Sequence, residues 1–222
     1  MGVITISRQY GSGGDEIARQ LCGRLNYRYL DKQLMSRVAS QVAMGEVKIS
    51  DFSEDSYKAR SFLDRWLGLS QPELVAEIRT WSESAIGTRA LRVERLDEAE
   101  AISLIQAIIT EVYRMDNMVI LGRGGQMILK DKANVLHVRI EAPFDERVRR
   151  VQEIERVTLA EAQEKVANRD KAAYSYIKRF YGVDWADPLL YHLVINTSLC
   201  GISASVQLIC EAVSALKLAS TA

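Results

Sequence analysis

The first residues that could do chemistry lie near the start of the chain, in the run Ser-Arg-Gln-Tyr-Gly-Ser-Gly-Gly-Asp-Glu at positions 7–16. Glycines let consecutive backbone N–H groups converge, and the first turn of a following helix adds unpaired N–H donors with a partial positive charge. The run lies between a β-branched stretch and an amphipathic one, and therefore predicts an anion-binding loop. Its cradle would consist of Gly11, Ser12, Gly13 and Gly14.

The same run departs from the P-loop pattern G-x-x-x-x-G-K-[ST] at three positions. Arg8 stands at the first glycine position, Gly14 at the lysine position and Asp15 at the hydroxyl position. A strand-to-helix turn in which Asp15 and Glu16 complement the helix N-terminus explains the loop equally well. The loop alone leaves both interpretations open.

The elements that must position this loop alternate between strand and helix. Strands are expected at 3–7, 27–30, 118–121, 135–140 and 193–196, and helices follow the loop and cover 99–114, 143–155, 159–180 and 202–218. This order predicts an α/β fold in which a five-stranded parallel sheet carries helices on both faces. No strand is predicted from about 32 to 96, so residues 38–97 are expected to form a helical insertion in a core made of 1–37 and 98–222.

Ligands of parallel sheets bind at the carboxyl ends of the strands. The glycine loop, Asp31, Arg123 and Asn196 all fall at such ends. An arginine at the end of a buried strand needs an anion to offset its desolvation, which favours an anion contact for Arg123. Asn196 could cap the next helix.

The composition of the chain argues against several classes of function. The 222 residues include 29 basic and 29 acidic side chains and 48% hydrophobic residues. This balance argues against a general nucleic-acid or membrane-surface binder. No stretch reads as a signal peptide or as a membrane span, and the three cysteines and two histidines lack metal-site spacing. We therefore expect a cytoplasmic protein without a zinc site that contacts neither nucleic acid nor membrane.

Several runs resemble the cytidylate kinase-like family, a branch of the P-loop nucleoside-monophosphate kinases. They are the opening Ser-Arg-x-Tyr-Gly-Ser-Gly-Gly, the run 29–37, the run Leu-Gly-Arg-Gly-Gly at 121–125, and Asn-Arg-Asp-Lys-Ala-Ala-Tyr-Ser-Tyr-Ile-Lys-Arg-Phe-Tyr-Gly-Val-Asp-Trp at 168–185. The likeness covers nearly the whole chain and is weakest from about 40 to 98. It implies a three-layer P-loop NTPase fold, nucleotide substrates, and phosphoryl transfer from ATP to a nucleoside monophosphate.

The resemblance also implies roles for individual residues. On the acceptor side it points to Asp31, Arg37, Arg123, Lys171 and Arg179, and it makes 38–97 the acceptor-binding insertion. A lid at about 145–160 would bring Arg147 and Arg150 over the donor phosphates, and Arg169 follows the lid. Asn196 would lie near the donor base, with the helix cap as the alternative. Arg123, Arg147, Arg150 and Arg169 are thus the predicted catalytic residues, although a solvated helix face is the competing interpretation for lid arginines.

The chain lacks two groups that active P-loop kinases use, the loop lysine and the hydroxyl beside it. Arg8 or a lid arginine could supply the missing charge, and Asp15 or Glu16 could hold Mg²⁺ directly. Two functions stay open, a Mg²⁺-dependent nucleotide kinase and a nucleotide-binding protein without turnover. A third interpretation is a helical interaction module that forms a homodimer through the insertion. The contacts of this dimer surface would come from Phe62, Trp66, Leu67 and Trp81.

Overall fold

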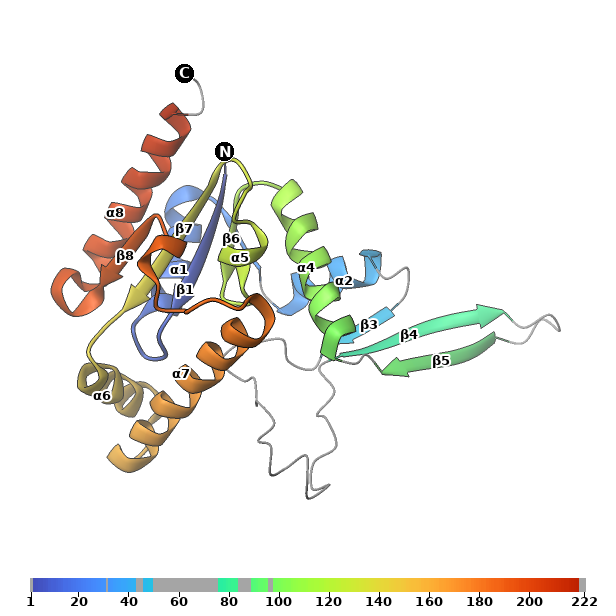
Figure 1. Cartoon of the computed structure of the whole chain (residues 1–222), viewed down its shortest axis with the longest axis horizontal. Coiled ribbons are helices and arrows are strands. Elements are labelled where there is room, and N and C mark those ends of the chain that lie inside the picture. Colours follow the sequence, from blue (N-terminus) through green and yellow to red (C-terminus); the bar gives the residue numbers. More distant parts are fainter. Residues whose placement is uncertain are drawn as a thin grey trace. The chain divides into compact units, whose positions relative to one another are not determined.

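The computed structural model describes residues 2–30, 32–42, 46–49, 76–83, 89–95 and 98–219 (Figure 1). These residues form two compact units. The first unit contains the described residues of 1–29 and 115–222, and the second contains those of 30–52 and 58–114. Each unit has its own sheet.

The first unit is built on a five-stranded parallel sheet. Its strands are β1 (Val3–Arg8), β2 (Arg28–Tyr29), β6 (Met118–Leu121), β7 (Val135–Glu141) and β8 (Leu193–Asn196). They lie in the order β2-β6-β1-β7-β8, so the strand that leads into the glycine loop is central. All four strand pairs are parallel, which confirms the predicted α/β sheet.

One face of this sheet is apolar. Ile4 and Ile6 of β1 belong to a buried cluster with α1 (Gly14–Leu25) and α8 (Thr197–Ala219). The two helices supply Ile17, Leu21, Val206, Ile209 and Val213 to it. Successive residues of a strand point to opposite faces of the sheet. The alternation of apolar and polar residues along β1 therefore determines which face these helices cover.

The opposite face carries polar residues. Thr5 and Ser7 of β1 pair in register with His137 and Arg139 of β7, and all four side chains are buried. The short helix α5 (Gly125–Ile128) packs on this side, where Gly125 lies against Thr5. Buried polar groups require partners, so this face must be held together by hydrogen bonds.

Two long helices follow β7. α6 (Phe144–Glu155) and α7 (Leu159–Tyr181) form a hairpin near the end to which the arrow of β7 points (Figure 1). Val148 and Val151 of α6 pack against Ala162 and Val166 of α7. A capping box between Thr158 and Glu161 starts α7, and the 3₁₀ turn η2 (Pro188–Leu190) precedes β8.

The second unit contains strands that the sequence analysis did not predict. Its helices are α2 (Lys32–Val42) and α4 (Glu98–Arg114), and its strands are β3 (Glu46–Ile49), β4 (Ala76–Glu83) and β5 (Arg89–Arg95). The strands form an antiparallel sheet in the order β3-β4-β5. The expectation of a purely helical stretch between 32 and 96 is therefore wrong.

The register of β4 and β5 places Glu77 opposite Arg95 and Glu83 opposite Arg89. Charged residues at many positions leave these strands without the apolar run that marks a buried parallel strand, and this explains why the sequence pattern did not indicate them. Trp81, one of the residues considered for a dimer surface, pairs with Leu91. Phe62, Trp66 and Leu67 lie outside the described residues.

Helix α8 corrects another expectation. By length and composition, Thr197–Leu216 is long and apolar enough to cross a membrane, so the statement that no stretch reaches that length is wrong. Gly201 has non-helical torsion angles and kinks the helix. Beyond the kink, Val206, Ile209 and Val213 pack on the sheet, and this packing explains part of the apolar composition.

Candidate phosphate-binding site

The glycine loop connects the central strand β1 to α1. Gly11 and Gly13 have φ angles of 77° and 88°, a left-handed conformation that favours glycine. A Cβ atom at Gly11 would lie 2.8 Å from the carbonyl oxygen of Arg147. Inside the loop, the N–H of Ser12 donates to the carbonyl of Gln9 over 3.2 Å. The loop conformation therefore depends on these glycines.

The loop ends at an uncapped helix terminus. Gly13 is the N-cap of α1 and provides no side-chain hydrogen bond, so the N–H groups of the first turn lack the partner that a cap would give. The hydroxyl of Ser12 is fully buried and has no hydrogen-bond partner among the described residues. Buried hydroxyls are normally satisfied, and an anion on the helix terminus would supply the missing acceptors.

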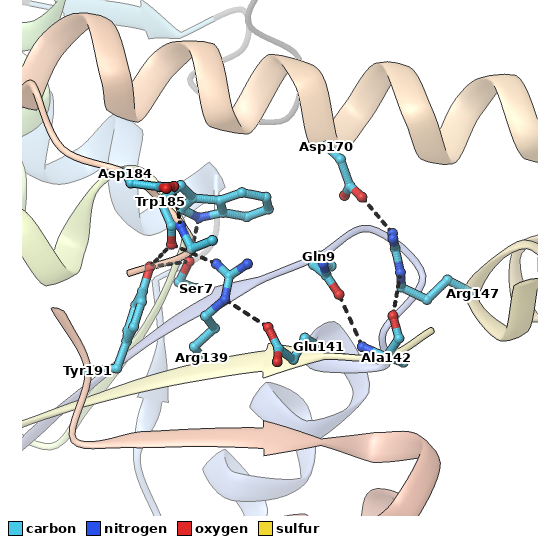
Figure 2. A network of polar contacts seen from close by, with 11 residues as sticks. Ser7, Gln9, Arg139, Glu141, Ala142, Arg147, Asp170, Asp184, Trp185 and Tyr191 are labelled. Atoms are coloured by element: carbon cyan, nitrogen blue, oxygen red, sulfur yellow. Dashed lines mark hydrogen bonds and ion pairs between the residues drawn. The ribbon is translucent and has the colours of Figure 1, made fainter. Parts of the chain in front are cut away.

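Tyr10 and Arg147 attach the loop to the α6–α7 hairpin. The N–H of Tyr10 donates to Asp170 of α7 over 2.9 Å, and Nη1 of Arg147 donates to the carbonyl of Tyr10 over 3.0 Å. The same Nη1 forms a 2.7 Å ion pair with Asp170, and Nε donates to the carbonyl of Ala142 (Figure 2). Arg147 is 4% exposed. Arg147 is thus one of the residues that hold the loop in place.

The other arginines near the α6–α7 hairpin lie in different surroundings. Nη1 of Arg150 donates to the carbonyl of Gly11 over 2.8 Å, so Arg150 lies directly against the loop. The guanidinium of Arg169 lies over the ring of Tyr10, 5.5 Å from its centroid. Tyr10 also donates to Glu155, and hydrogen bonds first from Lys165 and then from Tyr10 hold the pKa of Glu155 below its usual value.

The start of α8 closes the loop from the other side. Oγ1 of Thr197 donates to the carbonyl of Ser12 over 2.7 Å, and Thr197 is buried. Oδ1 of Asn196 accepts from the N–H of Ser198 over 3.0 Å. The structure therefore gives Asn196 the capping contact considered in the sequence analysis, while its predicted place near a donor base stays a prediction.

Arg123 follows β6 in an unusual backbone conformation. Gly122, Arg123 and Gly124 have φ angles of 68°, 60° and 68°, and left-handed φ at an arginine costs conformational energy that functional sites often carry. A Cβ atom at Gly124 would lie 2.7 Å from the ring of Tyr181, which explains why that position is glycine. Arg123 is half-buried, and its Nη1 lies 3.5 Å from the carbonyl of Leu121.

Charged residues near the carboxyl ends of β1 and β6 shift the pKa of Tyr29 in β2. Burial and then the negative charge of Asp15 raise its pKa, while the positive charges of Arg8 and Arg123 act in the opposite direction. Arg8 and Asp15 form an ion pair in which Nε and Oδ2 are 3.5 Å apart. Charged residues at and after the carboxyl ends of β1 and β6 therefore act on Tyr29 of β2. The roles predicted for Arg8, Asp15 and Arg123 stay predictions.

A buried polar network lies on the polar face of the sheet, and sequence reasoning missed it. The indole N–H of Trp185 donates to Ser7 over 2.7 Å, and Nη1 of Arg139 donates to the carbonyl of Trp185 over 2.9 Å (Figure 2). Arg139 also forms a 3.1 Å ion pair with Glu141, and Tyr191 donates to the carbonyl of Trp185. The network anchors the segment after α7 to the end of β1. Polar residues alternating along 135–141 were the available signal.

The remaining predicted residues are not brought to the loop by any described contact. Lys171 and Arg179 are exposed on α7, and Arg37 is exposed on α2 of the second unit. Asp31 lies outside the described residues. The acceptor roles of these four residues stay predictions.

The first turn of α1 carries the carboxylates that could hold Mg²⁺. Asp15 is 57% exposed and forms a 3.5 Å ion pair with Arg8, whereas Glu16 is bound by Arg19 and Gln20. Among the described residues no group of three metal-ligating side chains occurs. Phosphate-bound Mg²⁺ needs only one or two protein carboxylates, so Asp15 fits such an ion better than Glu16.

A central parallel strand, a glycine loop and a helix with an uncapped N-terminus place the chain among α/β proteins whose central strand leads into an anion-binding loop. The chain matches the cytidylate kinase-like family over residues 3–199 and belongs to that family. It is 23% identical over 210 residues to the cytidylate kinase of Ignicoccus hospitalis, covering 94% of this chain and 97% of that protein.

Two further comparisons concern a second relative and the fold. The cytidylate kinase of Sulfolobus acidocaldarius is 22% identical over 196 residues, which cover 88% of this chain and 85% of that protein. The crystal structure of an uncharacterized protein from Eubacterium ventriosum superposes with a TM-score of 0.62 at 19% identity, covering 96% of this chain and 99% of that one. The family resemblance stated from the sequence is confirmed.

Proposed function

We propose that the protein transfers a phosphoryl group from a nucleoside triphosphate to a nucleoside monophosphate. The observation that carries this proposal is the loop Gly11–Gly14, which combines two left-handed glycines, an uncapped helix terminus and a buried hydroxyl without a partner. Such a loop suits the phosphates of the donor nucleotide. Family membership supports the kinase chemistry, and cytidine monophosphate is the first acceptor to test because the relatives are cytidylate kinases.

Phosphoryl transfer needs positioning and positive charge rather than covalent catalysis. In this proposal Arg150 and Arg169 serve the donor side of the loop, and Arg123 serves the acceptor phosphate. Asp31, Arg37, Lys171 and Arg179 complete the acceptor contacts. Arg147 holds the loop in place, because its Nε and Nη1 donate to Ala142, Tyr10 and Asp170.

Mg²⁺ would be held by Asp15 together with the donor phosphates, with Glu16 as the second predicted carboxylate. When bound, the ion neutralises phosphate charge. The chain itself contributes orientation: the amides of the loop fix the donor, and the contact from Thr197 to Ser12 fixes the loop against α8.

A coupled assay with ATP, Mg²⁺ and each nucleoside monophosphate in turn tests this proposal. We expect turnover with at least one pyrimidine monophosphate. Arg123→Ala should reduce kcat/KM about 100-fold or more, the scale seen when a charge-stabilising donor is lost. The matched control is Arg24→Ala, because Arg24 is exposed at the opposite end of α1 from the loop.

The second candidate function is nucleotide binding without turnover. The observation that favours it is the pair of replacements at the lysine and hydroxyl positions, Gly14 and Asp15. If ATP raises the melting temperature while no monophosphate is phosphorylated, this second function replaces the first. If ATP neither binds nor reacts, both proposals are wrong.

A further inference from the structure

Two departures from the P-loop pattern are related, because one position gains a cationic side chain and the other loses one. The pattern has glycine at its first position and lysine at its seventh. This chain has Arg8 at the first position and Gly14 at the seventh. The long cation and the residue without a side chain have thus traded places within one loop.

The structure brings the two exchanged positions into contact. A Cβ atom built on Gly14 would lie 2.6 Å from Cβ and 2.9 Å from Cγ of Arg8. Both atoms are close to the backbone of Arg8, so no rotation of its distal side chain would relieve this overlap. A residue with a side chain at position 8 therefore favours glycine at position 14, and the two replacements depend on each other.

The guanidinium of Arg8 also reaches the hydroxyl position of the pattern. Its Nε lies 3.5 Å from Oδ2 of Asp15, and the side chain of Arg8 is 10% exposed. The ion pair is long, and Asp15 is more than half exposed. A phosphate bound at the helix terminus would compete with Asp15 for this guanidinium, because arginine binds phosphate with charge-assisted hydrogen bonds.

The other cations beside the loop are less suitable as the replacement. Nε and Nη1 of Arg147 donate to groups of the chain, and the residue is buried. Nη1 of Arg150 donates to the carbonyl of Gly11, so this group already binds the loop backbone. Arg8 alone among these three is coupled by packing to the vacant lysine position.

We propose that Arg8 supplies the positive charge that the loop lysine supplies in the P-loop pattern, with Gly14 making room for its side chain. This inference rests on the proposed nucleotide site. It makes Arg8 a donor-phosphate-binding residue and makes residues 8 and 14 one functional pair.

Binding of ATP and of inorganic tripolyphosphate, measured by titration calorimetry, tests the charge directly. Arg8→Gln preserves much of the side-chain volume without the charge, and should weaken binding of both ligands at least tenfold. Arg8→Lys should retain most of the affinity, and Arg24→Gln should leave binding unchanged. If Arg8→Gln binds tripolyphosphate within twofold of the wild type, the inference is overturned.

Exchanging Arg8 and Gly14 tests whether the two replacements depend on each other. Arg8→Gly should lose phosphate affinity, and Arg8→Gly/Gly14→Lys should regain at least tenfold over it. Gly14→Lys alone should melt at a lower temperature than the double variant, because Arg8 still occupies the space. A folded double variant that binds no better than Arg8→Gly contradicts the inference, and if the double variant does not fold, the Arg8→Gln result decides.

The same measurements separate this inference from the proposed function. If the wild type binds ATP and tripolyphosphate but phosphorylates no monophosphate, the kinase proposal fails while the role of Arg8 is still decided by the binding of Arg8→Gln. If the wild type binds neither ligand, both fail.

Discussion

Arg147 is a buried arginine whose charge is neutralised by contacts within the chain. It comes from α6, yet its donors hold the carbonyl oxygens of Tyr10 and Ala142 and the carboxylate of Asp170. Removing one partner of a buried ion pair leaves an uncompensated charge, which commonly costs about 3–5 kcal/mol. The contacts of Arg147 thus join the loop to the helical hairpin, while its predicted catalytic role stays a prediction.

We therefore expect Arg147→Met to lower the free energy of unfolding by about 3 kcal/mol. Urea unfolding followed by circular dichroism measures this change. Arg149→Met is the control, because Arg149 is exposed on the same helix and should change stability by less than about 0.5 kcal/mol. Equal losses for the two variants would show that the Asp170 contact contributes nothing.

Residue types near the site were predictable where they follow from spacing. The glycine loop and Arg123 could be placed at strand ends because parallel strands share a carboxyl edge. The buried network of Ser7, Arg139 and Trp185 was not predicted, because residues 7 and 185 are joined only by the folded chain. The same limit applies to Arg147, whose burial depends on a partner 23 positions away.

At the scale of elements, the turn into α1 depends on glycine geometry. We expect Gly11→Ala to lower stability by at least about 1 kcal/mol, since its φ is positive and Arg147 crowds the new methyl group. Gly23→Ala in the interior of α1 should instead raise stability by up to about 1 kcal/mol, because the site is open and alanine favours helix. Thermal melts of both variants test the opposite signs.

The hairpin of α6 and α7 depends on the cap between them. Thr158 accepts from the N–H of Glu161, and Glu161 accepts from the N–H of Thr158. Thr158→Ala should cost about 1 kcal/mol of unfolding free energy. Thr110→Ala, in the middle of α4, should cost nothing or stabilise slightly, and a larger loss there than at the cap would contradict this prediction.

The elements themselves were predicted unevenly. The strands β6 and β8 and the long helices agree with their predicted bounds to within a few residues, except that α8 begins five residues earlier than expected. Strands β3 to β5 were missed because charged residues occupy many of their positions, and such strands lack the apolar run that marks a buried parallel strand. The bounds proposed for the acceptor-binding insertion stay a prediction.

At the scale of the whole molecule, the polar face of the first unit should make stability depend on pH. His137 is buried against Thr5 and stacks on His192 with ring centroids 5.1 Å apart. Burial first, and then the charge of His192, lower the pKa of His137 from 6.5 to about 4. The unfolded chain therefore binds more protons than the folded chain between these pH values, and stability falls as the pH is lowered through this range.

The wild type should lose up to about 3 kcal/mol from this group between pH 7 and pH 4. His137→Asn keeps a hydrogen-bonding side chain near Thr5 but does not titrate, so its stability should fall less steeply with acid. Urea titrations at pH 7, 6, 5 and 4.5 compare the two slopes. Identical slopes would mean that the protonation of His137 does not contribute.

The indole of Trp185 has a practical consequence. It is 4% exposed, its N–H is bound by Ser7 at the end of β1, and the guanidinium of Arg139 lies 4.4 Å from the ring centroid. The chain has three tryptophans, and Trp66→Phe/Trp81→Phe would leave this one as the sole emitter. The fluorescence of that variant would report optically, without any attached dye, on changes beside the glycine loop.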